Sequence, residues 1–346
     1  MMTRIFVLSV LYLLTCCGCQ QLVLGDDAVN DPENNYEIFW RDFDAHYGLF
    51  GVRGWDWDSI YTVTQPQVTL QTSDEDLYEI FRSMVEYLDD THTFIYWPDR
   101  AFFAGNRAGN EEVETEFSAQ LIVDEFLNVI DSSQEESYVY GQLRDRNIGY
   151  LYLDNIDNED LDFGDQLLVD LGHNEALIID IRNNGGGSDR VGAALAGRFA
   201  DREELAYTVQ ERNGPQWDDF AEKTSYFLKP LGSQQYLKPV VILTDQITVS
   251  AAEVMLSYFK LLPRVTQIGT TTSGDFSDTG MRRFLPNGMQ YQYSIMKFLQ
   301  PDGSSLDGVG HVPDIYVRNT VGEIEAGQDR VLERSFEFLF DEYGIE

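Results

Sequence analysis

The stretch from Ala176 to Gly187 constrains the fold of this chain more than any other. It reads A-L-I-I-D-I-R-N-N-G-G-G: an apolar run rich in β-branched residues, followed at once by two asparagines and three glycines. Such a run predicts a buried strand. Consecutive glycines are entropically costly to order, so we expect their backbone to approach a ligand or a reacting atom. The alternative is a tight strand-to-helix turn without chemistry.

The segments around this turn alternate between predicted strands and helices from residue 147 onward. Short apolar runs predict strands at 147–153, 239–244 and 265–268, and a helix is expected over 250–261. This alternation is typical of a layered α/β domain. A turn at Asn287-Gly288 predicts a hairpin nearer the C-terminus.

The N-terminal part has a helical pattern instead. Aromatic residues recur near helical spacing over 36–61, which predicts a packed helical stripe. Ser73 can cap a second helix over 77–88, and that helix ends in a polar cluster at 89–93. Residues 117–123 are expected to form a strand.

The charge balance excludes two classes of partner. Acidic residues outnumber basic ones 59 to 24, which gives a net charge of −35 over 346 residues. Such a surface repels nucleic acid and anionic membrane surfaces, so neither is expected to bind.

The N-terminus predicts export. Arg4 and an apolar run over 5–14 precede Cys16, Cys17 and Cys19, an arrangement typical of a signal peptide with a lipobox over 1–19, followed by a tether over 20–35. We expect Cys19 to be lipidated, with Cys17 as the alternative, so that the protein is anchored in the cell envelope and does not span the membrane. An ordinary secretory signal, cleaved with its cysteines, is the other interpretation. Cleavage before Cys19 leaves no pair of cysteines for a disulfide or a thiolate zinc site.

A second informative stretch is T-V-S-A-A-E at 248–253, where a predicted strand turns into a helix. Ser250 and Glu253 fit a capping box, which is a purely structural role. Ser250 also suits a nucleophile, because the Ala251 N–H and the helix dipole there favour negative charge. Both interpretations stay open on this stretch alone.

A hydroxyl nucleophile needs a base, and the chain has four histidines. His92 follows a helix in a polar cluster and is a plausible base. We interpret His46 and His173 as structural, and His311 lies in a glycine-rich loop.

Four motifs together resemble the S41 peptidases, which include the C-terminal processing, tail-specific and tricorn-core proteases and retinoid-binding relatives. They are L-x-D-x-H-T at 88–93, L-I-I-D-I-R-N-N-G-G-G at 177–187, T-V-S-A-A-E at 248–253 and G-V-G-H-V-P-D at 308–314, in the family's order. The resemblance implies a ClpP/crotonase-like α/β domain over 147–346, a helical cap over 36–97 and a connecting segment over 98–146. That connecting segment is short for the PDZ domain that many members carry.

The resemblance also implies the site. Ser–Lys members carry a lysine in the turn where this chain has Asp275, so the chain is similar to the tricorn-like Ser–His branch. Ser250 is then the nucleophile and His92 the base. Thr91 and Asp307 are implied to orient the imidazole, although the acid is typically a glutamate, one methylene longer. The N–H groups of Ala251 and of Gly185 or Gly186 are implied to form the oxyanion hole.

We therefore expect a serine-type endopeptidase or peptidase acting on proteins or peptides. No metal or cofactor is expected, because the sequence has no H-E-x-x-H, P-loop or G-x-G-x-x-G motif. Two alternatives remain: a non-catalytic ligand-binding protein like the retinoid-binding relatives, or a lipid-anchored protein with a degenerate site.

Overall fold

The computed structural model describes residues 29–98, 100, 102–105, 116–134, 137–157, 160–216 and 218–346. The expected signal peptide, with Cys16, Cys17 and Cys19, lies outside these ranges, as does most of the expected tether. Within them, no helix combines the length and apolar character needed to cross a bilayer.

The N-terminal unit is built on helices that begin at side-chain caps. The helices are α2 (Pro32–His46), α3 (Phe50–Arg53), α4 (Trp57–Thr64), the short η1 (Gln65–Gln67) and α5 (Asp74–Leu88). The Asp31 carboxylate accepts the Asn34 N–H at 2.8 Å and starts α2, while Ser73 accepts the Asp76 N–H and starts α5. The predicted cap at Ser73 is confirmed.

The predicted aromatic stripe forms the core of this unit. Phe39 and Phe43 are fully buried, and the Phe39 ring lies 4.2 Å from that of Phe81 on α5. Tyr291, from far along the chain, lies 5.0 Å from Phe39. It belongs to a four-stranded sheet of order β11-β12-β1-β2. The strands are β1 (Phe94–Tyr96), β2 (Phe103–Ala104), β11 (Arg283–Phe284) and β12 (Gln290–Gln292). The expected Asn287-Gly288 hairpin therefore completes the N-terminal unit, which is not one continuous segment.

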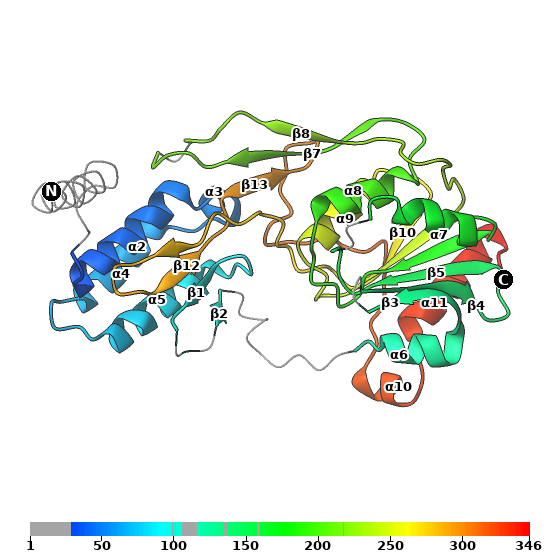
Figure 1. The fold of residues 1–346 in the computed structure, drawn as a ribbon, viewed down its shortest axis with the longest axis horizontal. Coiled ribbons are helices and arrows are strands. Elements are labelled where there is room, and N and C mark those ends of the chain that lie inside the picture. The colour runs from blue at the N-terminus through cyan, green and yellow to red at the C-terminus, as the bar shows by residue number, and fades with distance from the viewer. Residues whose placement is uncertain are drawn as a thin grey trace, which may run out of the picture.

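The second unit is a seven-stranded sheet of order β14-β10-β9-β6-β5-β4-β3, with helices on both faces (Figure 1). The run from β5 to β14 is parallel, and β3 and β4 form an antiparallel edge. The strands are β3 (Leu127–Ser133), β4 (Tyr138–Leu143), β5 (Ile148–Leu153), β6 (Ala176–Asp180), β9 (Val240–Thr244), β10 (Val265–Gly269) and β14 (Ile315–Tyr316). The predicted α/β class is confirmed. Because β3 and β4 join this sheet, the unit includes part of the expected connecting segment.

The helices explain why the central strands are apolar throughout. One face of the sheet packs on α7 (Phe163–Leu171), α8 (Asp189–Gly197) and α9 (Ala251–Phe259), and the other on α6 (Ala119–Leu121), η3 (Ile122–Phe126) and α11 (Arg330–Tyr343), with α10 (Val321–Glu325) beside α11. On β6, Leu177 and Ile179 enter the first core, and Ala176 and Ile178 enter the second. A strand covered on both faces needs apolar residues at every position.

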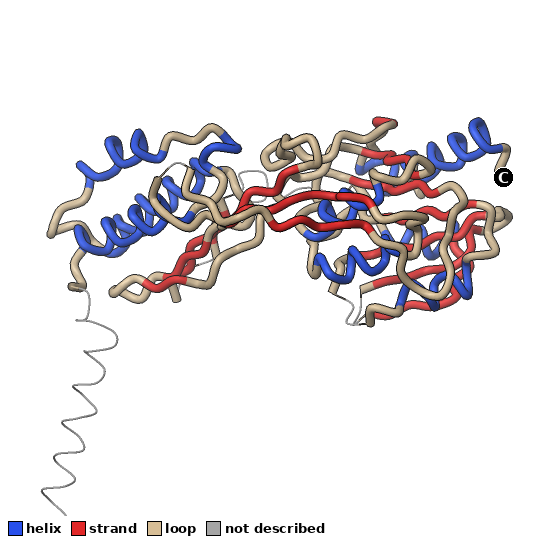
Figure 2. The backbone as a smooth tube through the Cα atoms, turned by 90° about the horizontal axis from the view of Figure 1, so that it is seen from above, coloured by secondary structure: helices blue, strands red, loops and turns tan. Residues whose placement is uncertain are grey.

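A third sheet, of order β13-β7-β8, runs between the two units (Figure 2). It consists of β7 (Glu204–Glu211), β8 (Thr224–Leu228) and β13 (Met296–Leu299). Just after β7, the Arg212 side chain donates to the Asp44 carbonyl of α2 at 2.8 Å. The sheet therefore ties the helical unit to the α/β unit, and the site lies where the two units meet.

Candidate active site

Ser250 lies at the junction between β9 and α9 in a strained conformation. Its φ of 60° and ψ of −127° fall in a region that residues with a Cβ rarely adopt. Its hydroxyl makes no capping hydrogen bond to α9. The Glu253 carboxylate instead accepts the N–H groups of Gly274 and Asp275 at 2.8 and 2.9 Å. The capping-box interpretation is therefore wrong, and the Ser250 hydroxyl is directed elsewhere.

The hydroxyl meets His92. The distance from His92 Nε2 to Ser250 Oγ is 3.0 Å, across 158 residues of sequence. The loop after α5 positions the ring: the buried Asp90 carboxylate accepts the His92 N–H at 2.9 Å and the Thr93 hydroxyl at 2.8 Å. Sequence reasoning missed Asp90, although an Asp two residues before the histidine is the signal of an Asx turn.

The glycine turn packs directly against the serine. A Cβ on Gly186 would lie 2.7 Å from Ser250 Cβ, and the φ of Gly186 is 98°, so only glycine fits there. The turn is joined to the serine loop by the Val249 N–H, which donates to the Asn184 carbonyl at 3.1 Å. The expected close approach of bare backbone is thus present.

The three expected oxyanion donors differ in their availability. The Gly186 N–H donates to Asn184 Oδ1 at 2.9 Å and is already engaged, which leaves Gly185 as the other of the two glycines that were expected to supply a donor. The Gly185 N–H makes a long contact of 3.4 Å with the Asp154 carbonyl. Among the described residues, the Ala251 N–H has no hydrogen-bond acceptor and lies at the N-terminus of α9 beside the serine. Ala251 is the donor best placed for an oxyanion.

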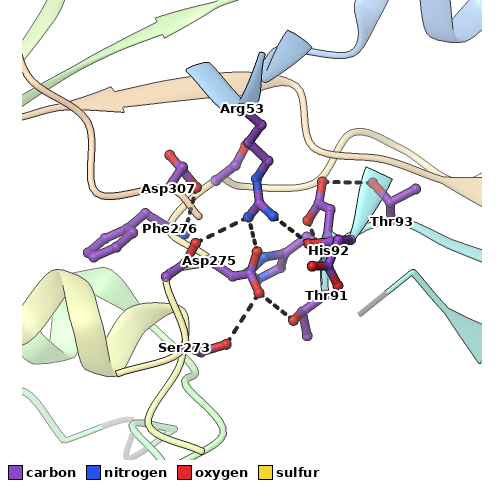
Figure 3. A network of polar contacts seen from close by, with 12 residues as sticks. Arg53, Thr91, His92, Thr93, Ser273, Asp275, Phe276 and Asp307 are labelled. Atoms are coloured by element: carbon purple, nitrogen blue, oxygen red, sulfur yellow. Dashed lines mark hydrogen bonds and ion pairs between the residues drawn. The ribbon is translucent and has the colours of Figure 1, made fainter. Parts of the chain in front are cut away.

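Asp307 is not where the resemblance implied. Its carboxylate accepts the Phe276 N–H at 3.0 Å and the Ser305 hydroxyl at 3.3 Å (Figure 3). His92 Nδ1 is buried without a hydrogen-bond partner in the described structure, so no direct bond joins it to Asp307. The short Asp side chain is taken up by its own loop, and the expected Asp307–His92 contact is wrong.

The carboxylate that contacts the histidine loop, residues 89–93 after α5, is that of Asp275. It accepts the Thr91 hydroxyl at 2.5 Å and pairs with the Arg53 guanidinium, which also donates to the Asp89 and Gly274 carbonyls (Figure 3). The side chains of Arg53 and Asp275 are only 6% and 4% exposed. Sequence reasoning considered Asp275 only as the residue that replaces a lysine, and it did not consider Arg53.

Burial shifts the pKa values of several titratable side chains around the site. Burial raises the pKa of Asp307 to about 7, against the lowering effect of Arg53, and it raises the pKa of Glu253 to about 8. Burial also lowers the pKa of His311 to about 4. His311 Nε2 lies 3.1 Å from Ser257 Oγ and 3.0 Å from the Glu253 carbonyl, and the neutral ring joins α9 to its neighbouring loop.

Comparisons with known proteins match both units of the chain. The model for peptidase family S41 matches residues 147–317, and the model for the tricorn protease C1 domain matches residues 28–86. The chain belongs to peptidase family S41. Gly186, Ser250 and His92, which come from three of the four motifs, meet at the site.

Relatives of this S41 member include processing proteases. The carboxy-terminal processing protease CtpA of Bacillus subtilis is 26% identical over 180 residues, which cover 51% of this chain and 36% of that protein. The chain spans about a third of the length of the curated relatives it matches. A Parabacteroides merdae structure, described provisionally as a peptidase, is 27% identical with a TM-score of 0.80 and covers 90% of this chain and 97% of its own. The tricorn protease shares the fold, with 15% identity and a TM-score of 0.59 over 90% of this chain and 37% of that one.

No lysine occupies the position that the Ser–Lys members of the family use. Lys260, the nearest lysine in sequence, lies ten residues along α9 from Ser250, about 15 Å at helical rise. It pairs with Asp314 at 3.1 Å. The Lys297 ammonium lies 3.7 Å from the centre of the Phe220 ring. His92 is the base that the geometry offers.

Proposed function

We propose that this chain is a serine-type peptidase that hydrolyses peptide bonds of proteins or peptides. The observation that carries the proposal is the 3.0 Å contact between His92 Nε2 and the hydroxyl of the strained Ser250. A serine hydroxyl becomes an effective nucleophile when an adjacent base takes its proton. Membership of family S41 supports the same reaction class.

The proposed reaction follows the geometry. Ser250 Oγ attacks the scissile carbonyl while its proton passes to His92 Nε2. The Ala251 N–H stabilises the negative oxygen of the tetrahedral intermediate. His92 then gives the proton to the leaving amine, and an acyl-enzyme remains on Ser250. Water, deprotonated by His92, hydrolyses that ester and regenerates the site.

The alternative functions have less support. A non-catalytic ligand-binding protein on this fold has no need for a strained serine hydroxyl aimed at a histidine, or for a free backbone N–H beside it. A degenerate site would be expected to have lost one of these features.

Hydrolysis of an unfolded protein such as casein tests the proposal. We expect wild type to cleave it and Ser250→Ala and His92→Ala to lose activity by at least about 10³-fold. Lys260→Ala and Lys297→Ala are matched controls, which should retain activity if they fold. An active His92→Ala variant beside an inactive lysine variant would contradict the assignment of the base.

We also propose that the protein is exported and lipid-anchored through Cys19, or through Cys17. The support is the basic residue Arg4, the apolar run over 5–14 and the cysteines that follow it. Metabolic labelling with a palmitate analogue should mark wild type and not a variant in which both cysteines are serine. An unlabelled, soluble secreted wild type would exclude the anchor.

A further inference from the structure

One guanidinium connects the segments that build the site. Arg53, at the end of α3, donates to the Asp89 carbonyl in the histidine loop. It also donates to the Gly274 carbonyl at 3.1 Å and pairs with Asp275 in the loop behind Ser250. The Arg53 side chain is 6% exposed. A buried guanidinium with this many acceptors fixes the relative position of the two units.

Asp275 makes contact with both reacting segments. Its carboxylate accepts the hydroxyl of Thr91, the residue directly before His92. Its backbone carbonyl accepts the Ser250 N–H at 3.2 Å. One residue is therefore bonded to the segment that carries the base and to the segment that carries the nucleophile. The Asp307 carboxylate instead accepts hydrogen bonds from Phe276 and Ser305, which belong to neither of these two segments.

We propose that Asp275, held by Arg53, is the positioning acid of this site. It orients the Thr91–His92 segment and stabilises the imidazolium that forms when Ser250 loses its proton. The inference rests on the proposed peptidase function and deepens it, because it places the acid in the turn where Ser–Lys relatives carry their lysine.

The ion pair with Arg53 and the hydrogen bond from Thr91 favour an ionised Asp275. The pKa of Asp275 is raised, by burial first and also by the Asp90 carboxylate, whereas Arg53, the Thr91 hydroxyl and His92 act to lower it. The proton moves only from Ser250 Oγ to His92 Nε2 and on to the leaving group, and the Asp275 carboxylate stays ionised throughout. Since His92 Nδ1 has no partner among the described residues, Asp275 acts through the Thr91 hydroxyl and through its field.

The test compares three isosteric variants that each replace one carboxyl group with an amide. They are Asp275→Asn, Asp307→Asn and the surface control Asp341→Asn on α11, whose residue is exposed. The readout is the second-order rate at which a fluorophosphonate labels Ser250, measured from pH 5 to pH 9. Circular dichroism and thermal unfolding establish that each variant is folded.

We expect Asp275→Asn to label about 10²-fold more slowly and to move the midpoint of the pH–rate profile to lower pH. The midpoint moves because the substitution removes the negative charge of Asp275, which stabilises the imidazolium of His92, while the positive charge of Arg53 remains. A merely structural role would lower the rate without moving the midpoint. Asp341→Asn should match wild type, and Asp307→Asn should keep the wild-type midpoint.

The opposite pattern overturns the inference: an unmoved midpoint in Asp275→Asn, or a moved midpoint in Asp307→Asn alone. Wild-type labelling with an unaffected Asp275→Asn variant removes only this inference. No labelling of Ser250 in wild type removes the proposed function and this inference together.

Thr91 provides a second measurement if Asp275→Asn does not fold. Thr91→Val removes the hydroxyl that donates to Asp275 and keeps the side-chain shape, while Thr91→Ser keeps the hydroxyl. We expect Thr91→Val to lose at least about tenfold in labelling rate and Thr91→Ser to stay within a few-fold of wild type. Equal rates in the two variants would contradict the role of this bond.

Discussion

Two adjacent glycines in the turn at 185–187 have different surroundings, and the difference shows what the nucleophile requires. Gly186 has a φ of 98° and lies against Ser250, whereas a Cβ on Gly185 would meet nothing within 4 Å. The strained φ of Ser250 depends on a neighbour that leaves this space empty. The turn therefore supports the serine directly, beyond linking a strand to a helix.

Gly186→Ala should show whether the contact of Gly186 with Ser250 matters, as distinct from the need for small residues throughout the turn. The added methyl group would clash with Ser250 Cβ at 2.7 Å and strain the backbone, so we expect a loss of about 1–3 kcal/mol in unfolding free energy and at least tenfold in activity. Urea unfolding and a casein assay measure the two effects. Gly185→Ala is the matched control, and an equal loss in both variants would show that the turn, rather than the contact with Ser250, is sensitive.

At the scale of elements, α9 carries more than the serine at its start. Glu253, one turn into the helix, is fully buried and accepts three hydrogen bonds from the loop over 272–275. Two of these donors are backbone N–H groups, one on each carboxylate oxygen. The helix therefore holds the loop that presents Asp275.

Glu253→Gln should show this dependence. Either orientation of the amide directs its NH₂ at the N–H of Gly274 or Asp275, so we expect a loss of about 1–3 kcal/mol in unfolding free energy together with reduced activity. Chemical denaturation provides the measurement. Glu337→Gln on α11, where the side chain is 67% exposed, should change the free energy by less than about 0.5 kcal/mol. A stable, fully active Glu253→Gln variant would contradict the role of Glu253 in holding the loop over 272–275.

The sequence predicted elements where local chemistry and tertiary packing agree. The apolar run at β6, the cap at Ser73 and the Asn287-Gly288 turn formed as expected, because each depends on its own residues. Residues 117–123 were expected as a strand and instead enter α6 and η3, since Ser118 accepts the Leu121 N–H at 3.2 Å and starts a helical turn. Apolar spacing alone does not distinguish the two over so short a segment.

The candidate site was predictable in part for the same reason. Motifs identified Ser250 and His92, whose contact the structure shows. The acid was misplaced because the choice between Asp307 and Asp275 depends on which carboxylate Arg53 and Thr91 meet after the units pack. Contacts between residues more than 180 positions apart leave no periodic signal in one sequence.

At the scale of the whole molecule, buried acids at the junction couple folding to pH. The pKa of Asp307 is raised to about 7 by burial, so near neutral pH the folded state binds a proton that the unfolded state has released. Its contribution to stability is therefore lost as the pH rises through 7. The raised pKa of Glu253, about 8, acts in the same direction.

Asp307→Asn should flatten this pH dependence. Between pH 6.5 and 8.0 we expect the unfolding free energy of wild type to fall by about 1 kcal/mol more than that of the variant. Urea unfolding at the two pH values measures the difference, and Asp341→Asn controls for the loss of one surface charge. A wild-type slope equal to that of Asp307→Asn would show that Asp307 does not titrate in this range.

One step is central to the proposed mechanism: His92 activates Ser250 as a nucleophile. Tandem mass spectrometry of the protein after fluorophosphonate treatment at pH 7.5 tests it most directly. We expect one adduct, on Ser250, in wild type, and labelling at least about 10²-fold slower in a folded His92→Ala variant. An adduct on another residue, no adduct, or His92→Ala labelled as fast as wild type would contradict the claim.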